Sequence, residues 1–320
     1  MSFAGGGTDL PAFYERHGGA VLSVTIDKRI RVVVGQRFEG DVRVGYSEVE
    51  IVPDATRVRH ELVREAMRRA GIPRGVDVLT LADVPSHGTG LGSSSAVTVG
   101  LLNALYAFQG IAKPALTLAQ EACQIEIDVL GKPIGRQDQY AAALGGFNLI
   151  EFLPGDGGVR VSPVIAPDGT IRRLHRCLLL FYTGVRRGSD EILRTQGEQI
   201  ASGQVLEPMH QLRDLAYEMH QRLVAGDVEA VGALLEKGWA LKRSASGNGG
   251  DDSLVDDSYE RARVAGALGG KLLGAGGGGF LLLFVPPDRQ PAVRNALREL
   301  REIPFRFTWH GTEILLLEHA

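Results

Sequence analysis

Hydrophobic residues along the chain predict a succession of strands and helices. Residues 76–82 are apolar and rich in branched side chains, which is typical of a strand. A turn with Gly88, Gly90 and Gly92 follows, and then the hydroxyl residues Ser93 to Ser95. Beyond them, apolar residues recur at helical spacing, namely Val97, Leu101, Leu102 and Leu105. The pattern therefore predicts a strand, a glycine loop and a helix with a serine-rich first turn.

This arrangement is suited to binding phosphate. Unpaired N–H groups and the positive end of the helix dipole meet at a helix N-terminus. Glycines let the backbone come close to a ligand and adopt turns with positive φ. The stretch is not a Walker loop, because no lysine follows the glycines. The alternative is an ordinary turn in which Ser93 caps the helix.

The remaining pattern mixes both kinds of element and predicts an α+β fold without internal repeats. Strands are expected at 20–34 (a hairpin or one long bent strand), 42–46, 146–152, 177–181 and 280–285, with two more near Phe305 and Ile314. Helices are expected at 56–70, 114–130, 140–144, 254–268 and 289–301, with three or four between 189 and 241. The polar segment 244–252 is expected to be a loop. A turn at 154–158 predicts the boundary between a domain of residues 1–155 and a domain of residues 156–320.

Composition limits the classes of function. The 320 residues carry a net charge of −3, so the basic excess of nucleic-acid binders is absent. No apolar run is long enough to span a membrane, and no signal peptide precedes the first glycines. Cys123 and Cys177 lie in apolar segments and are expected to be free thiols in a reducing cytosol. We therefore expect a cytoplasmic protein without a nucleic-acid or membrane partner.

Glycine is abundant, with 42 residues, and it is clustered. The clusters lie at residues 5–7, 88–92 and 274–279. The third stands between an apolar helix and an apolar strand, where linkers are rare. We expect it to be a tight loop beside a ligand, and the alternative is a hairpin that needs close backbone approach.

These motifs together resemble the GHMP kinases, the family of galactokinase, homoserine kinase, mevalonate kinase and phosphomevalonate kinase. The family motif Gly-Leu-Gly-Ser-Ser is matched by residues 90–94, and the motif Gly-Ala-Gly-Gly-Gly by residues 274–278. Their order and spacing fit across nearly the whole chain. The resemblance implies a two-domain fold, with an N-terminal domain like domain 2 of ribosomal protein S5 and a ferredoxin-like C-terminal α/β domain.

Within the family, the chain looks most like the D-glycero-D-manno-heptose 7-phosphate kinases. The matching segments are Ala4 to Asp9, Gln137 to Ala142, Gly145 to Asn148, Tyr182 to Gly184 and Gly269 to Lys271. This likeness implies ATP-dependent phosphorylation of the anomeric hydroxyl of the heptose 7-phosphate, giving the 1,7-bisphosphate for nucleotide-activated heptose synthesis. The alternatives are a kinase for another sugar, such as fucose or galactose, and a non-catalytic sugar or nucleotide sensor on the same fold. A homodimer is left open.

The resemblance also assigns the reacting groups to residues of this chain. Asp138 would be the base for the sugar hydroxyl, or would orient it. Mg²⁺ would be bound by the Ser94 hydroxyl and the Glu126 carboxylate, because Mg²⁺ takes few protein oxygens. Without the resemblance, Asp138 reads as a cap of the helix at 140, and Glu126 as a solvated helix residue. The ATP phosphates would be held by the loop from Pro85, through Gly88, Thr89, Gly90, Leu91, Gly92, Ser93, Ser94 and Ser95.

Residues for the sugar phosphate follow from the same resemblance. Asp9 would accept hydrogen bonds from sugar hydroxyls, whereas the residue alone reads as a cap. Arg186 and Lys242 are chosen from several basic residues for the substrate phosphate. Lys271 would support the last glycine loop. The full substrate-binding set is Gly7, Thr8, Asp9, Gln137, Tyr182, Arg186, Lys242, Gly276 and Gly277.

The chain departs from the family pattern in two places. Family chains usually carry a short strand with a basic residue before the first glycines, and here hardly a strand precedes Gly5. Either the true start lies upstream or an edge strand is short. In addition, Pro85 is one residue further from Gly90 than usual, with His87 in the extra space. We expect His87 to face solvent.

Overall fold

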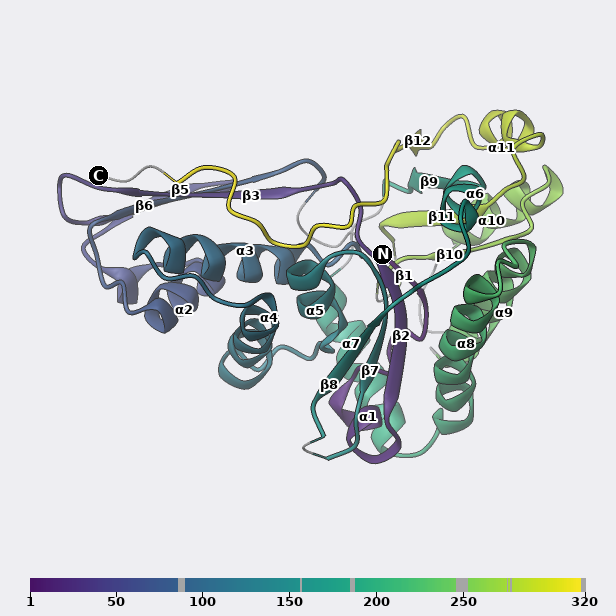
Figure 1. Cartoon of the computed structure of the whole chain (residues 1–320), viewed down its shortest axis with the longest axis horizontal. Helices are drawn as coiled ribbons and strands as arrows, with labels where there is room; N and C mark the ends of the chain where they lie inside the picture. The colour runs from purple at the N-terminus through teal and green to yellow at the C-terminus, as the bar shows by residue number, and fades with distance from the viewer. Residues whose placement is uncertain are drawn as a thin grey trace. The chain divides into compact units, whose positions relative to one another are not determined.

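The computed structural model describes residues 1–85, 90–155, 157–184, 188–245, 253–274, 276 and 278–317. Contacts divide the chain into two compact units, each assembled from separate stretches of sequence (Figure 1). Unit 1 comprises Met1–Ile26, His87–Leu91 and Phe147–Phe307, and unit 2 comprises Asp27–Ser86, Gly92–Gly146 and Thr308–Ala320. Residue 155 lies inside unit 1. As a boundary between family domains, it stays a prediction.

Unit 2 is built on one four-stranded sheet. Its strands are, in spatial order, β3 (Ile30–Gln36), β6 (Val76–Ala82), β4 (Val42–Gly45) and β5 (Val49–Val52). β4 pairs with β6 in parallel, and the other two pairs are antiparallel. Side chains alternate between the two faces of a strand, and the buried set on one face is Val42, Val44, Val76 and Val78.

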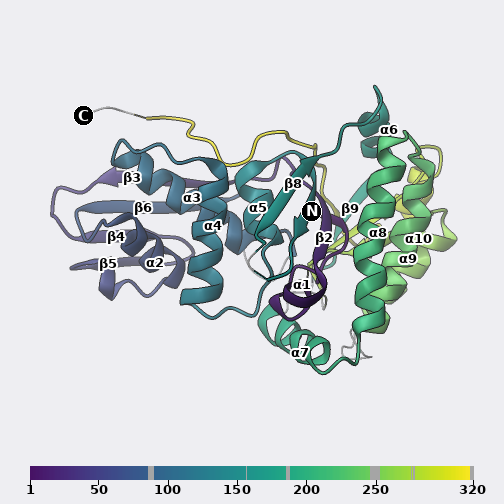
Figure 2. The same cartoon turned by 60° about the horizontal axis from the view of Figure 1, so that its bottom comes forward.

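Helices of unit 2 cover that buried face (Figures 1 and 2). They are α2 (Glu61–Ala70) and α3 (Ser93–Phe108), with α4 (Ala115–Cys123) packed on α3. A Cβ atom on Gly100 of α3 would lie 3.1 Å from Val32 Cγ2, so a glycine is what lets the helix approach β3. A short 3₁₀ helix, Ala55–Arg57, precedes α2 and takes up the start of the helix predicted at 56–70.

The helix predicted at 114–130 is present, but its winding changes. α4 runs directly into the π-helical segment Gln124–Val129. π-helices are rare and occur often at functional sites. α5 (Gln137–Leu144) then begins before the predicted start at 140, so Asp138 lies in its first turn and Arg136 is the capping residue.

Unit 1 contains two sheets. The first has the order β1 (Ser2–Ala4), β2 (Gly19–Val24), β7 (Phe147–Phe152) and β8 (Val159–Pro163), all antiparallel. Every residue of β2 and β7 is buried. Near it, α1 (Pro11–His17), α7 (Ser189–Ala201) and α8 (Leu206–Val224) share an apolar cluster that includes Leu10, Phe13, Met209 and Leu212.

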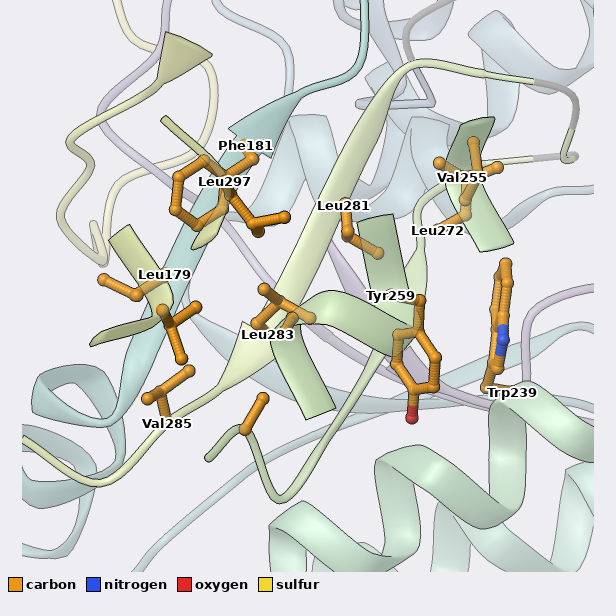
Figure 3. Close-up of a cluster of buried hydrophobic side chains, with 13 residues drawn as sticks. Leu179, Phe181, Trp239, Val255, Tyr259, Leu272, Leu281, Leu283, Val285 and Leu297 are labelled. Atoms are coloured by element: carbon orange, nitrogen blue, oxygen red, sulfur yellow. The ribbon is translucent and has the colours of Figure 1, made fainter. Parts of the chain in front are cut away.

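The second sheet of unit 1 has the order β10 (Gly269–Leu272), β11 (Phe280–Phe284), β9 (Leu178–Tyr182) and β12 (Arg301–Glu302). The accompanying helices are α6 (Thr170–Arg176), α9 (Glu229–Ala245), α10 (Ser253–Val264) and α11 (Gln290–Ala296). Figure 3 shows the core between sheet and helices, where Leu281 and Leu283 meet Tyr259 and Trp239. The fold is therefore α+β, as predicted.

Several predicted elements differ in the structure. The segment 20–34 is neither a hairpin nor one strand, because β2 and β3 belong to different sheets. In the described chain, no strand forms at Phe305 or Ile314, and only Phe307 makes an isolated bridge, to Ile26. The helix predicted at 289–301 ends at Ala296 in the structure. Arg301, the last residue of the predicted range, is the first residue of β12. Within the described ranges, none of the helices combines the length and apolar composition needed to cross a bilayer.

The pattern missed short elements. These are β5, β8, β10, α1 and α6, which have four to seven residues each. So short a segment shows too little periodicity to be recognised. The polar segment 244–252 begins at the end of α9, and its residues from 246 onward lie outside the described residues.

Candidate active site

The serine-rich turn after β6 is the N-terminus of α3. Gly92 precedes the helix in a left-handed conformation, with φ of 70°. Ser93 is the first helical residue and Gly92 holds the capping position, so the alternative in which Ser93 caps the helix is wrong. The positive end of the α3 dipole is therefore presented by glycine and serine backbone. Gly88 and Thr89, two of the predicted ATP-binding residues, lie outside the described residues.

The carboxylate of Glu126 is buried against this helix, with 1% of the residue exposed. Its Oε2 accepts hydrogen bonds from Ser95 Oγ at 2.9 Å and from Gln139 Nε2 at 2.5 Å. Its Oε1 accepts one from Thr98 Oγ1 at 3.1 Å. Ser95 and Thr98 are three residues apart and lie on the same side of the helix. Glu126 is thus a buried, hydrogen-bonded group, and its reading as a solvated helix residue is wrong.

Two opposing effects act on the ionisation of Glu126. Burial raises its pKa, and the hydrogen bonds from Ser95, Gln139 and Thr98 oppose that rise. The Asp138 carboxylate also raises the pKa of Glu126, so the two acids are close enough to repel each other. A cation between them would relieve this repulsion.

The oxygen atoms around Glu126 fit a Mg²⁺ ion. A carboxylate offers about four lone pairs, so Glu126 keeps one for a further partner. Gln139 Oε1 is buried and has no hydrogen-bond partner among the described residues, and Ser94 is exposed. These are hard oxygen ligands, which Mg²⁺ prefers. In the described part of the chain, no group of three or more His, Cys, Asp or Glu side chains is placed to hold a metal ion by itself. A Mg²⁺ ion here would also take oxygen ligands from phosphate and water.

The predicted metal pair of Ser94 and Glu126 is not joined directly in the structure. The neighbouring hydroxyl, that of Ser95, is the one that bonds Glu126, whereas the Ser94 carbonyl oxygen lies 3.1 Å from Thr98 Oγ1 and shares that hydroxyl with Glu126. Because Ser95 holds Glu126, the exposed Ser94 hydroxyl can face a ligand. Its role at the metal stays a prediction.

Asp138 lies beside the N-terminus of α3. A Cβ atom built on Gly92 would be 2.9 Å from Asp138 Cγ and 3.1 Å from its Oδ1. Asp138 is exposed, Gln137 before it is half-buried, and Gln139 after it is buried. Because Arg136 holds the capping position of α5, the alternative role of Asp138 as a helix cap is wrong. An exposed carboxylate here can reach a ligand bound at the start of α3.

In unit 1, the first glycine cluster is held against β2. A Cβ atom on Gly5 would lie 1.8 Å from the Ala20 carbonyl oxygen, so only glycine fits there. Thr8 is fully buried, and its hydroxyl lies 2.8 Å from the Gly5 oxygen and 3.0 Å from the Ala20 oxygen. The Thr8 hydroxyl also accepts from Ala20 N at 3.1 Å. Thr8 therefore fixes the loop, and its contact with a sugar stays a prediction.

Asp9 is buried just before α1. Its Oδ1 accepts a hydrogen bond from Gly7 N at 3.0 Å, and 2% of the residue is exposed. Leu10 is the capping residue of α1, so the reading of Asp9 as its cap is wrong. Gly7 has φ of 99°, and a Cβ atom there would meet Gln196 Nε2 at 2.9 Å. The sugar-binding roles of Gly7 and Asp9 stay predictions.

The second and third glycine clusters meet in unit 1. A Cβ atom on Gly90 would lie 2.2 Å from the Leu273 oxygen, and one on Gly274 would lie 2.3 Å from Gly90 Cα. Both glycines also have positive φ, at 74° and 78°. Lys242 Nζ donates a hydrogen bond to the Gly274 oxygen. The third cluster connects the antiparallel strands β10 and β11, so it is a hairpin connection that packs on Gly90, the start of the predicted ATP motif.

Thr183 lies in the segment Tyr182 to Gly184 that carries the family likeness, but the sequence assigned it no role. Its buried hydroxyl donates to the Gly279 oxygen at 3.0 Å and accepts from Gly279 N at 3.1 Å. Thr183 thereby ties the end of the third glycine cluster to the end of β9. The sequence marked the motif that contains Thr183, but it gave no sign of the bond to Gly279.

Lys271 is a buried cation on β10. Its Nζ lies 3.5 Å from Ser2 Oγ and from the Phe3 oxygen, and 8% of the residue is exposed. Among the described residues, no carboxylate interacts with it. Burial, with a smaller effect from the positive charge of Lys242, lowers the pKa of Lys271 to about 7. Lys271 thus joins β10, next to the third glycine cluster, to β1.

The remaining predicted contacts are only partly described. Tyr182 ends β9 half-buried, with its ring centroid 5.2 Å from that of Phe280. Among the described residues, no atom lies within 4 Å of a Cβ atom built on Gly276. Half-buried Leu91 belongs to unit 1. Outside the described residues lie Arg186, Gly277 and His87.

This combination of a serine-tipped helix, a buried carboxylate and an exposed acid at the helix N-terminus is that of a phosphotransferase. Family comparison agrees. The model of the GHMP kinases N terminal domain matches residues 57–146, and the GHMP kinases C terminal model matches residues 212–302. Together they cover more than half of the chain. The chain belongs to the GHMP kinase family, as the sequence motifs predicted.

Relatives and solved structures resemble the chain along most of its length. The D-glycero-alpha-D-manno-heptose 7-phosphate kinase of Campylobacter jejuni is 29% identical over 330 residues, covering 98% of this chain and 96% of that protein. The galactokinase of Pyrococcus furiosus is 27% identical and covers 78% of this chain and 73% of that protein. The crystal structure of a D-glycero-D-manno-heptose 1-phosphate kinase from Bacteroides thetaiotaomicron has a TM-score of 0.80 and 26% identity, and the match covers 97% of this chain and 94% of that one.

The predictions of fold and class are therefore confirmed. The chain has the GHMP kinase N-terminal and C-terminal domains and a mixed helix and sheet structure. It is an ATP-dependent phosphotransferase that acts on a sugar hydroxyl.

Proposed function

We propose that the chain transfers the γ-phosphoryl group of ATP to the anomeric hydroxyl of D-glycero-D-manno-heptose 7-phosphate, forming the 1,7-bisphosphate. The observation that carries the chemistry is the position of Asp138 against Gly92, because it puts a proton acceptor beside the phosphate-binding end of α3. The Campylobacter jejuni relative, similar over 98% of this chain, supports the choice of substrate. The product would serve nucleotide-activated heptose synthesis in the cytoplasm, where ATP is available.

The residues around α3 have separate tasks in this proposal. Backbone N–H groups of Gly92 to Ser95 would bind the ATP phosphates. Bound Mg²⁺, held by Glu126 and Ser94, would neutralise charge on the transferred phosphoryl group. Ser95, Thr98 and Gln139 keep the Glu126 carboxylate in place. Asp138 would orient the sugar hydroxyl and take up its proton.

The substrate residues of unit 1 complete the proposal. Asp9, fixed by the Gly7 amide, would accept hydrogen bonds from sugar hydroxyls. Arg186 and Lys242 would bind the phosphate of the substrate. Gly276, where a Cβ atom would meet none of the described residues within 4 Å, would let the third glycine cluster approach the sugar. These assignments rest on the family motif and remain proposals residue by residue.

A substrate panel tests the proposal. The purified protein is mixed with ATP, Mg²⁺ and one acceptor at a time: the heptose 7-phosphate, the heptose 1-phosphate, fucose, galactose or mevalonate. We expect ADP release to be fastest with the heptose 7-phosphate, and phosphorus NMR to show a new phosphate on the anomeric carbon. Faster turnover of the heptose 1-phosphate or of a free hexose would refute the assigned substrate.

A second candidate is a kinase for a free sugar. It is favoured by the likeness to the Pyrococcus furiosus galactokinase, which spans 78% of this chain. The same panel separates the two candidates. A non-catalytic sensor is opposed by the presence of Asp138, Glu126 and Ser94, and any acceptor-dependent ATP turnover excludes it.

A further inference from the structure

One face of the unit 2 sheet is apolar, and none of the described helices or strands covers it. It is the face turned away from α2 and α3 (Figures 1 and 2). We call it the outer face and define it by Val33, Val49, Ile51, Leu79 and Leu81, which are 51%, 67%, 59%, 36% and 60% exposed. A sheet with one face in water normally carries polar residues there. Apolar residues on both faces are typical of a sheet that is covered on both sides.

Strand register joins these side chains into one surface. Val33 is opposite Leu79, Leu79 is opposite Gly45, and Gly45 is opposite Val49. Gly45 has no side chain, and Leu79 lies over it, since a Cβ atom on Gly45 would be 2.5 Å from Leu79 Cδ2. An apolar row therefore crosses all four strands without a charged side chain.

The charges beside this row are already paired. Arg43 donates to Asp77 at 2.8 and 3.0 Å, and Arg31 donates to Asp83 at 2.6 Å. Nucleic acids and acidic membranes attract unpaired basic side chains, and these arginines are neutralised within the sheet. A second copy of the same face would meet neither net repulsion nor an unpaired charge.

The outer face alone supplies part of the area that a stable dimer needs. Four strands of ordinary spacing and rise present on the order of 400 Å² on one face, about half of the 800 Å² that each partner in a stable complex usually buries. More apolar surface adjoins it. Phe38, in the turn after β3, is fully exposed, and the exposed residues Ile314 to Leu317 follow Glu313, which pairs with Arg29 just before β3. Both views show this tail running beside β3.

We propose that the outer face is a homodimer interface, in which two copies stack their unit 2 sheets face to face about a twofold axis. An interface of this symmetry uses the same patch on both partners, so the patch must be complementary to itself. The outer face meets that condition, because it is apolar along one row and its neighbouring charges are paired. In the dimer, the outer face of each sheet would be covered by the sheet of the other copy, as its apolar side chains require.

The test is the mass of the protein in solution. Sedimentation equilibrium of the full chain between 1 and 100 µM is expected to show a dimer. The variant Val49→Glu/Leu81→Glu, which brings four new negative charges into the interface, is expected to be a monomer over the whole range, with unchanged circular dichroism and ATP turnover. The control is Ile165→Glu/Val264→Glu, which alters apolar residues that are 77% and 89% exposed in unit 1 and should leave the dimer intact.

Two results would overturn the proposal. A wild-type chain that is monomeric at 100 µM would show that the outer face serves another partner. A folded Val49→Glu/Leu81→Glu variant that is still dimeric would place the interface elsewhere. Should that variant fail to fold, Phe38→Ser replaces it, because this substitution removes only a fully exposed ring, and it should weaken dimerisation at least about tenfold. Unchanged dimerisation of Phe38→Ser would then count against the proposal.

Discussion

The Asp138 carboxyl group lies next to the position that a side chain on Gly92 would occupy. A Cβ atom at Gly92 would stand 2.9 Å from Asp138 Cγ, a distance that real Cβ atoms essentially never show. The same glycine has φ of 70°, which turns the chain into α3. The absence of a side chain thus meets two needs at one position, a left-handed backbone and room for an acid at the helix N-terminus.

Replacing Gly92 by alanine is expected to reduce turnover beyond its effect on stability. The left-handed backbone alone costs alanine about 1 kcal/mol, and the new methyl group must also displace Asp138. We expect kcat to fall by about 10- to 100-fold. The matched control is Gly40→Ala, at φ of 74° with no atom within 4 Å of the new Cβ, which should lose similar stability and keep its kcat. If both variants keep their kcat, the spacing between Gly92 and Asp138 does not matter for catalysis.

Asp138→Asn should lower kcat by about 10²- to 10⁴-fold, because an amide cannot take up the proton of the sugar hydroxyl. The fold and the affinity for a non-hydrolysable ATP analogue should be unchanged, as measured by thermal unfolding and calorimetry. Asp128→Asn is the control, since Asp128 is an exposed acid on the π-helical segment. Wild-type turnover in Asp138→Asn would disprove its assignment as the base.

Ser94→Ala and Ser95→Ala should separate metal binding from structural support. Ser94 is exposed, so its loss should raise the Mg²⁺ concentration for half-maximal activity several-fold and leave stability unchanged. Ser95 donates to buried Glu126, so its loss should lower the free energy of unfolding by about 1–3 kcal/mol. Urea unfolding and Mg²⁺ titrations of activity provide the readouts. The reverse pattern would make Ser95 the metal ligand.

The stability of the protein should rise with pH because of Lys271. Its pKa is about 7 in the folded chain against 10.5 for an unperturbed lysine, so the unfolded chain binds more protons between these pH values. The free energy of unfolding then increases with pH across this window, by at most about 1.4 kcal/mol per unit. Urea unfolding at pH 7, 8 and 9 should show a steeper rise for wild type than for Lys271→Met.

The control for this prediction is Lys237→Met, because Lys237 has a side chain that is 56% exposed and pairs with Glu218 on the surface. Lys237→Met should keep the wild-type slope. Identical slopes for wild type and Lys271→Met would mean that Lys271 stays protonated in the folded chain, with its burial cost met in some other way.

Long patterns in the sequence were enough for much of the fold. The strand at 76–82, the helix after Ser93 and the strands at 177–181 and 280–285 all appear with bounds close to those predicted. The hydrophobic pattern could not predict which strands pair with each other. β2 and β3 are adjacent in the chain and lie in different sheets, because their pairing depends on β7 and β6, far along the sequence.

For the candidate site, motifs identified residues but not their surroundings. Spacing alone gave no sign that Ser95, and not Ser94, would bond Glu126, since this depends on which side of α3 faces the π-helical segment. The bond between Thr183 and Gly279 was hidden for a similar reason, as its partners are 96 residues apart. Contacts between segments that are far apart in the sequence produce no periodic pattern within either segment, so they cannot be predicted from local spacing.

The interleaving of the two units also governs the order in which the chain can fold during synthesis. β2 leaves the ribosome early, yet its neighbour β7 begins only at Phe147, and α8, whose Tyr217 bonds Glu151 of β7, follows later still. Unit 2 likewise cannot be completed before Thr312 is synthesised, because Thr312 accepts a hydrogen bond from Asn103 at 3.0 Å. A nascent chain must therefore keep unpaired strands soluble until translation is almost complete, and a prematurely terminated product would contain neither unit in finished form.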